Sequence, residues 1–97
     1  MNEWGSEPVE VRDNKARNRY ELTLEGGTAF VSYGLSGDTI SLFHAEVPRH
    51  LRGQGIGERM VDAVMADIRR RGLRAVPYCS FVAGHVAGKP EYADLLA

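Results

Sequence analysis

Alternating apolar and polar side chains mark the first half of the chain. In residues 20–25 (YELTLE) every second residue is apolar, which is the period of a strand with one buried face. The next segments, TAFVSY and TISLFHAEV, are rich in β-branched and aromatic residues, and Pro48 ends the second of them. The pattern therefore predicts an antiparallel meander. Its strands are residues 20–25, 28–33 and 39–47, with turns at 26–27 and 34–38.

A helical period replaces the alternation after a cluster of glycines. Ile56, Met60, Val64 and Ile68 recur every four residues, which is typical of an amphipathic helix, and Gly72 is its expected end. A strand at residues 73–82 is expected next, parallel to the third strand because a helix joins the two. The remaining predicted segments are a glycine-rich connection at 83–88 and a short helix at 90–96.

These elements predict an α/β (α+β) fold with a mixed, mainly antiparallel sheet. The central helix follows the glycine-rich turn, and a short helix ends the chain. The length of 97 residues indicates one domain, residues 1–97, and the polar residues 1–19 are interpreted as a loose lead-in with a turn or loop at 12–19.

Composition narrows the classes of function. With 43% hydrophobic and 26% charged residues the chain is expected to fold, and its net charge of −1 argues against a general nucleic-acid binder. Residues 49–74 carry seven basic against three acidic side chains, which suits either an anionic ligand or a solvated helix face.

The cysteine content and the first residues of the chain indicate the cellular compartment of the protein. Cys79 is the only cysteine, which excludes an intramolecular disulfide and argues against a cysteine-based metal site. Residues 1–12 contain three glutamates and no apolar run, so they predict neither a signal peptide nor a membrane span. We expect a cytoplasmic protein that needs no metal and has neither a membrane nor a nucleic acid as partner.

The turn RGQGIG, residues 52–57, is the first candidate site. A strand, a glycine-rich turn and a helix gather free backbone N–H groups at the positive end of a helix dipole, where anions bind. The turn does not end in the Gly-Lys-Ser/Thr of a P-loop, and it fails the G-x-G-x-x-G dinucleotide fingerprint. The alternative is that these glycines only form a tight turn.

The segment VPRHLRGQGIG, residues 47–57, resembles the signature of the GCN5-related N-acetyltransferases. The resemblance implies that acetyl-coenzyme A (acetyl-CoA) is the co-substrate and that the loop holds its pyrophosphate, while the preceding strand binds the pantetheine arm. The coenzyme-binding residues implied in this way are Ala45, Val47, Arg52, Gly53, Gln54, Gly55, Ile56 and Gly57.

His44 and the segments PYCSFV and PEYADL narrow the resemblance to a branch of very short, single-domain members with a His/Cys pair. Such chains lack the two helices that larger relatives insert after their first strand, so the acceptor stays open: a protein lysine, a polyamine or a small metabolite. The oligomeric state is open as well.

His44 and Cys79 are the candidate catalytic residues, because they lie near the ends of two strands expected to be parallel neighbours. Either Cys79 accepts the acetyl group with His44 as base, or an acceptor amine attacks acetyl-CoA directly while His44 takes its proton. Packing is the other interpretation: His44 is in step with Ile40 and Leu42, and free cysteines are commonly buried. The leading hypothesis is an N-acyltransferase acting on an amine; the alternatives are a non-catalytic acyl-CoA-binding module and, third, a structural role.

Overall fold

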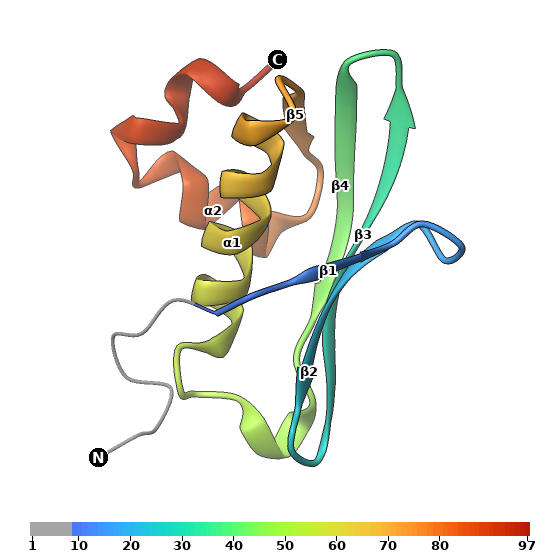
Figure 1. Ribbon diagram of the computed structural model, residues 1–97. Helices are drawn as coiled ribbons and strands as arrows, with labels where there is room; N and C mark the ends of the chain where they lie inside the picture. Colours follow the sequence, from blue (N-terminus) through green and yellow to red (C-terminus); the bar gives the residue numbers. More distant parts are fainter. Residues whose placement is uncertain (1–8) are drawn as a thin grey trace.

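A five-stranded sheet carries its helices on one face, and its other face is not covered by them (Figure 1). The structure is a computed structural model that describes residues 9–97. Strands β1 to β4 are antiparallel neighbours, and β5 pairs parallel with β4, so the expected mixed, mainly antiparallel fold is confirmed. The elements are β1 Arg12–Asn14, β2 Arg19–Leu24, β3 Gly27–Ser36, β4 Thr39–Glu46, the 3₁₀ helix η1 Arg49–Leu51, α1 Ile56–Arg70, β5 Arg74–Pro77, α2 Ser80–Ala87 and the 3₁₀ helix η2 Pro90–Leu95.

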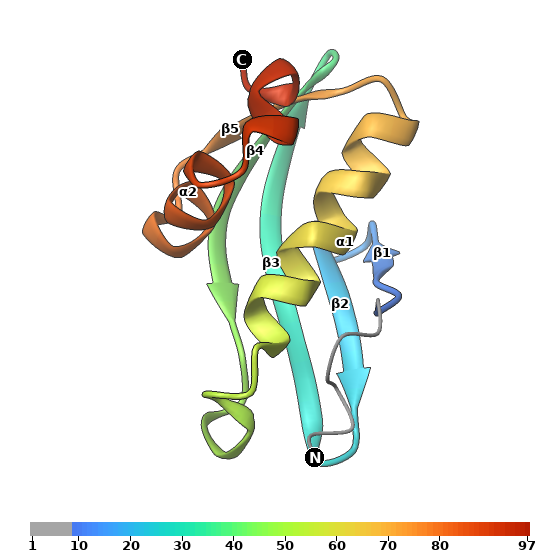
Figure 2. The same cartoon turned by 90° about the vertical axis from the view of Figure 1, so that its left-hand side faces the viewer.

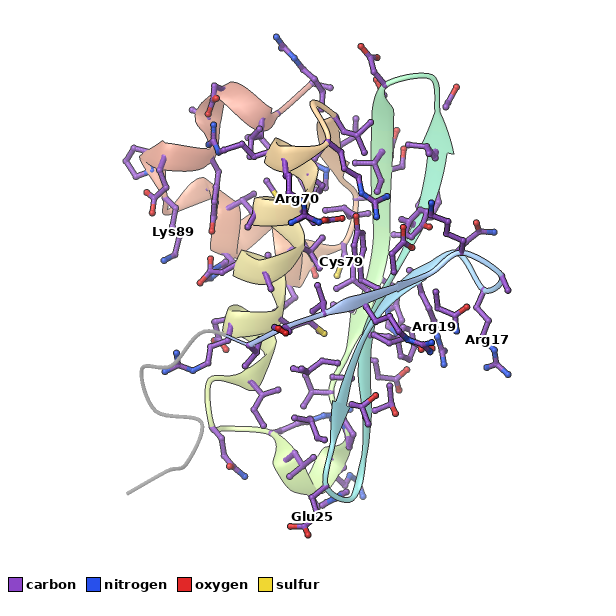
Figure 3. All side chains as sticks on the ribbon, viewed as in Figure 1. Arg17, Arg19, Glu25, Arg70, Cys79 and Lys89 are labelled. Carbon is purple, nitrogen blue, oxygen red and sulfur yellow. The ribbon has the colours of Figure 1, made fainter. Side chains whose placement is uncertain are left out.

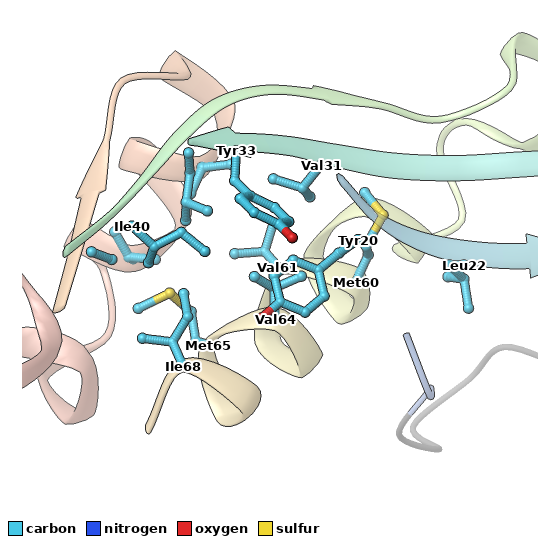
Figure 4. Packing of buried hydrophobic residues seen from close by; sticks show 14 of the residues in the cluster. Tyr20, Leu22, Val31, Tyr33, Ile40, Met60, Val61, Val64, Met65 and Ile68 are labelled. Carbon is cyan, nitrogen blue, oxygen red and sulfur yellow. The ribbon is translucent and has the colours of Figure 1, made fainter. Parts of the chain in front are cut away.

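The core lies between the inner face of the sheet and α1 (Figures 2 and 4). Alternate residues of β2, β3 and β4 point inward, and the apolar side of α1 packs against them. The hydroxyl of Tyr20 donates to Asp67 on α1 over 2.6 Å, which satisfies the two buried polar groups. Fully buried members of this core include Val31, Leu42, Met60, Val61, Val64, Met65 and Ile68.

Helix α1 begins and ends at glycines in the left-handed region. Gly55 is its N-cap with φ of 77°, and Gly72 follows its C-cap with φ of 69°. Only glycine adopts such angles without steric cost. The N–H of Leu73 then reaches back to the carbonyl of Ile68 over 3.0 Å, a bond that closes the helix end. The predicted helix and its stop are confirmed.

Two predictions for the amino-terminal half are wrong. Of the turn or loop expected at residues 12–19, the turn forms at 15–18, but residues 12–14 form an edge strand in which Arg12 on β1 bonds Glu21 on β2. The part of the predicted lead-in before residue 9 lies outside the described residues. Gly34 does not begin a turn but continues β3, and its missing side chain makes room for the Phe43 ring, which would lie 2.9 Å from a Cβ there. The turn is at residues 37–38.

The strand expected at residues 73–82 is also wrong beyond Pro77. The N–H groups of Tyr78 and Cys79 both donate to the carbonyl of Leu42, which turns the chain away from β4 and starts α2 at Ser80. The apolar run resembled a strand because α2 is short and apolar on most sides. Residues 83–88, expected as a connection, therefore lie largely in this helix.

The predicted carboxy-terminal helix forms as the 3₁₀ helix η2. After it, Leu96 bridges Ala75 on β5, and the Ala97 N–H donates to the Ala75 carbonyl over 2.9 Å. Within residues 9–97 no helix has the length and apolar character needed to cross a membrane.

Candidate functional site

A cavity of about 490 Å³ opens where β4 ends and α1 begins. The end of β4, η1, the glycine loop, the first turn of α1 and one side chain of α2 form its walls. Its volume suits a bound small molecule or part of a larger one. The lining residues are Ala45, Glu46, Val47, Leu51, Arg52, Gly53, Gly55, Ile56, Gly57, Glu58 and Phe81. Of the predicted coenzyme-binding residues, Gln54 is the one outside this lining.

The glycine loop points an anion-binding surface into the cavity. Gly53 and Gly55 have φ of 82° and 77°, and a Cβ at either position would have nothing within 4 Å, so the space above the loop is open. The first N–H groups of α1 lack intrahelical partners by helix geometry, and Gly55 as N-cap has no side chain to accept from them. This end of a 15-residue helix also carries the positive end of its dipole.

Side-chain contacts hold the loop in place. The Nε of Arg52 donates to the carbonyl of Val47 over 2.9 Å, so this guanidinium closes the loop onto the residue that follows β4 and leaves positive charge at the cavity. Gly57 lies under the Phe81 ring, which would be 2.9 Å from a Cβ at that position. The absence of a side chain at Gly57 thus lets α2 supply a wall of the cavity.

The strands β4 and β5 separate next to the cavity. Their pairing ends at Leu42 and Pro77. Beyond these residues β4 continues to Glu46, whereas the segment that follows β5 enters α2. Beyond Leu42 the edge of β4 is therefore no longer covered by β5. Such an edge offers backbone N–H and C=O groups to an extended ligand.

A β-bulge in β4 decides which way His44 points. Leu42 pairs with Tyr33 and His44 pairs with Ser32, so two residues of β4, Phe43 and His44, stand opposite Ser32. The bulge reverses the alternation. His44 lies on the outer face with its side chain 61% exposed, and the expectation that it is in step with buried Leu42 is wrong.

His44 and Cys79 contact different surroundings. The imidazole lies 3.6 Å from the carboxylate of Glu46 and packs edge-on to Phe30 at 6.0 Å between ring centroids. Cys79 is the half-buried N-cap of α2 and packs against the core, on the helix side of the sheet (Figure 3). Between these two residues of the described chain there is neither a hydrogen bond nor an ion pair.

Several residues of the site were not predicted from the sequence. Phe81 was placed on a strand, and Glu46 was overlooked although it lies two positions after His44, the spacing that puts two side chains of a strand on one face. Phe43 and Tyr78 form a stacked pair on the outer face, with centroids 5.8 Å apart. Alternation from Ile40 and Leu42 already places Phe43 on this face, but only the bulge places His44 and Glu46 there, and the sequence contains no signal for the bulge.

A second polar cluster lies away from the cavity, between α1, α2 and η2. The Tyr92 hydroxyl donates to Asp62 over 2.6 Å, and His85 Nε2 lies 2.8 Å from the same oxygen. Burial alone raises the pKa of Asp62, but the hydrogen bonds from Tyr92 and His85 lower it overall. His85 is mostly buried, so it is part of the packing of the C-terminal helices. In residues 9–97 no group of three or more His, Cys, Asp or Glu is arranged to hold a metal ion.

Comparison with known proteins extends over most of the chain. Residues 19–95 match the family described as GCN5-related N-acetyl-transferase. Protein NATD1 of Xenopus tropicalis is 28% identical over 96 residues, covering 94% of this chain and 88% of that protein. The solution structure of a GCN5-like protein from Staphylococcus aureus shares the fold with a TM-score of 0.70 at 23% identity, over 92% of this chain and 88% of that one.

Proposed function

The chain belongs to the GCN5-related N-acetyltransferase family, and we propose that it transfers the acetyl group of acetyl-CoA to an amine. The observation that carries this proposal is the cavity of about 490 Å³, because it joins an anion-binding helix start to the uncovered edge of β4. A coenzyme with a pyrophosphate and an extended amide-containing arm needs both surfaces. We place the reaction in the cytoplasm and assign it no metal.

Each end of the coenzyme has a surface of suitable chemistry. Backbone N–H groups of the glycine loop and the first turn of α1 would hold the pyrophosphate, with Arg52 adding charge. The amide groups of the pantetheine arm would pair with the edge of β4 beyond Leu42. The residues assigned to coenzyme binding are Ala45, Val47, Arg52, Gly53, Gln54, Gly55, Ile56 and Gly57.

Two routes transfer the acetyl group. In direct attack the amine nitrogen forms a bond to the thioester carbonyl carbon, the C–S bond breaks, and CoA leaves as a thiolate that takes up a proton. His44 accepts the first proton of the ammonium group and makes the nitrogen nucleophilic. In the covalent route Cys79 first exchanges with the thioester, and the amine then attacks the acetylated cysteine. The outward position of His44 and the core-side position of Cys79 favour direct attack.

Coenzyme binding is tested by thermal unfolding. Free CoA at about 100 times its dissociation constant should stabilise the fold by about 2.7 kcal/mol and raise the Tm. Absence of a shift would contradict both the transferase and a non-catalytic acyl-CoA-binding module.

Intact mass after incubation with acetyl-CoA separates the routes. An acetyl adduct that is present in the wild type and absent in Cys79→Ala supports the covalent route. Release of CoA by both proteins, only when an amine is added, supports direct attack. Binding of CoA without release, over a broad panel of amines, indicates the binding module.

A further inference from the structure

Four side chains share the outer face of the sheet beside the cavity. Phe43 lies on this face of β4 with Tyr78 stacked on it, and the bulge brings His44 and Glu46 to the same face. Glu46 also lines the coenzyme cavity, so it joins the cavity to the open face. We call these four residues the acceptor face.

The charge of Glu46 is not neutralised by a permanent cation. Its one ion-pair partner among the described residues is His44, and both side chains are at least half exposed. The nearby guanidinium of Arg19 lies over Phe30 and is bonded to Glu21 over 2.7 Å. Other carboxylates have arginine partners, such as Asp94 with Arg69. Glu46 therefore leaves negative charge available on the outer face, at the wall of the cavity.

The two rings add an apolar and π-electron surface to the same face, starting at Phe43, the neighbour of His44 in β4. Phe43 is 53% exposed and Tyr78 66%, although aromatic side chains are usually buried. Stacked rings on the same face as a carboxylate suit a group that is cationic at one end and aliphatic along its length, because ring faces attract cations and cover methylene groups. A neutral aryl amine lacks the charge that Glu46 would match.

We propose that the acceptor face binds the acceptor as an alkylammonium ion, with Glu46 holding the cationic nitrogen and the Phe43–Tyr78 pair covering the alkyl chain. This inference rests on the proposed function and names its substrate class. The ammonium gives one proton to His44, which becomes an imidazolium beside Glu46. The free amine attacks the thioester carbonyl, the C–S bond breaks, and the second nitrogen proton is released to the CoA thiolate through solvent.

Acceptor kinetics with matched variants test the role of Glu46. Glu46→Gln and Glu58→Gln each remove one carboxylate from the cavity wall, but only Glu46 lies beside His44. At saturating acetyl-CoA, Glu46→Gln should raise the KM for 1,5-diaminopentane and for a lysine-containing peptide about threefold to tenfold, with kcat and the KM for acetyl-CoA nearly unchanged. Glu58→Gln should leave the amine KM unchanged. The two acceptors distinguish a free polyamine from a peptide lysine as the source of the group.

Three results would overturn the inference. They are an equal effect of the two variants, a change confined to the KM for acetyl-CoA, and faster turnover of 4-aminobenzoate than of either alkylamine by the wild type.

A binding measurement tests the acceptor face even if no acetyl transfer is detected. In the CoA complex, 1,5-diaminopentane should shift the ring resonances of Phe43 and Tyr78, with Tyr92 as an internal reference that does not move. The shifts should saturate at lower amine concentration in the wild type than in Glu46→Gln. Unshifted rings, or equal saturation in both proteins, would refute the acceptor face while CoA binding and the Tm test of the proposed function still stand.

Discussion

The inner and outer faces of the sheet are built by the same strands but hold different kinds of residues. The inner face presents fully buried side chains such as Val31 and Leu42 to α1. The outer face presents ion pairs, the exposed stacked rings and His44. Because stability depends on buried apolar area, substitutions on the inner face should lower the free energy of unfolding, whereas substitutions on the outer face should leave it nearly unchanged. The inner face should govern unfolding, and the outer face should govern chemistry.

The largest effect on stability is expected from the inner face. Leu42→Ala should lower the free energy of unfolding by about 2–5 kcal/mol, because it removes a side chain with no exposed surface and leaves a cavity. Urea unfolding followed by circular dichroism measures this loss. Ser41→Ala, the neighbouring position on the other side of the strand, is the control and should change stability by less than about 0.5 kcal/mol. Equal losses would contradict the division between the faces.

A smaller effect on stability is expected in the glycine loop, which lines the cavity. Gly55→Ala should cost about 1–2 kcal/mol, because a Cβ is disfavoured at φ of 77°. Gly84→Ala is the matched control: it lies within α2, has open space for a Cβ, and should stabilise by about 0.5–1 kcal/mol. Thermal unfolding of the two variants compares them, and destabilisation by both would show that the loop conformation is not the cause.

An acid-dependent effect is expected from the ion pairs of the outer face. The hydrogen bond from Arg19, with help from Arg12, lowers the pKa of Glu21 from 4.5 to about 2. A lowered pKa in the folded state means that the stabilisation is complete above about pH 4.5 and is lost as the pH falls towards 2. In Glu21→Gln the fall of Tm over this interval should be shallower. If the Tm of the wild type and of Glu21→Gln falls equally with pH, other carboxylates cause the acid sensitivity.

The smallest effect on stability, with a large effect on rate, is expected for His44→Gln. The side chain is mostly exposed, so the free energy of unfolding should change by less than about 0.5 kcal/mol. Loss of the proton acceptor should lower kcat/KM for the amine by about 10²–10⁴-fold. Urea unfolding and initial rates measured on one preparation sharpen the comparison. A destabilised variant with normal turnover would reverse the assignment of the outer face.

The sequence predicted those parts of the fold that have a regular period. The meander, α1 and the glycine loop follow from spacing alone, because alternation and a four-residue repeat are local properties. The end of β5 did not follow, since it depends on two N–H groups sharing the carbonyl of Leu42 across the sheet. The face of His44 was missed for a similar reason: the bulge at Phe43 is set by pairing with β3.

The bulge at Phe43 has an evolutionary consequence. A single additional codon suffices to place one more residue in a strand, yet here it reverses the side faced by every later position of β4. The outward positions after the bulge, His44 and Glu46, can then vary with the chemistry of the acceptor, while Ala45 between them still packs against the core. Small insertions and deletions at this point offer a lineage a way to acquire or lose a reactive side chain without rebuilding the hydrophobic interior.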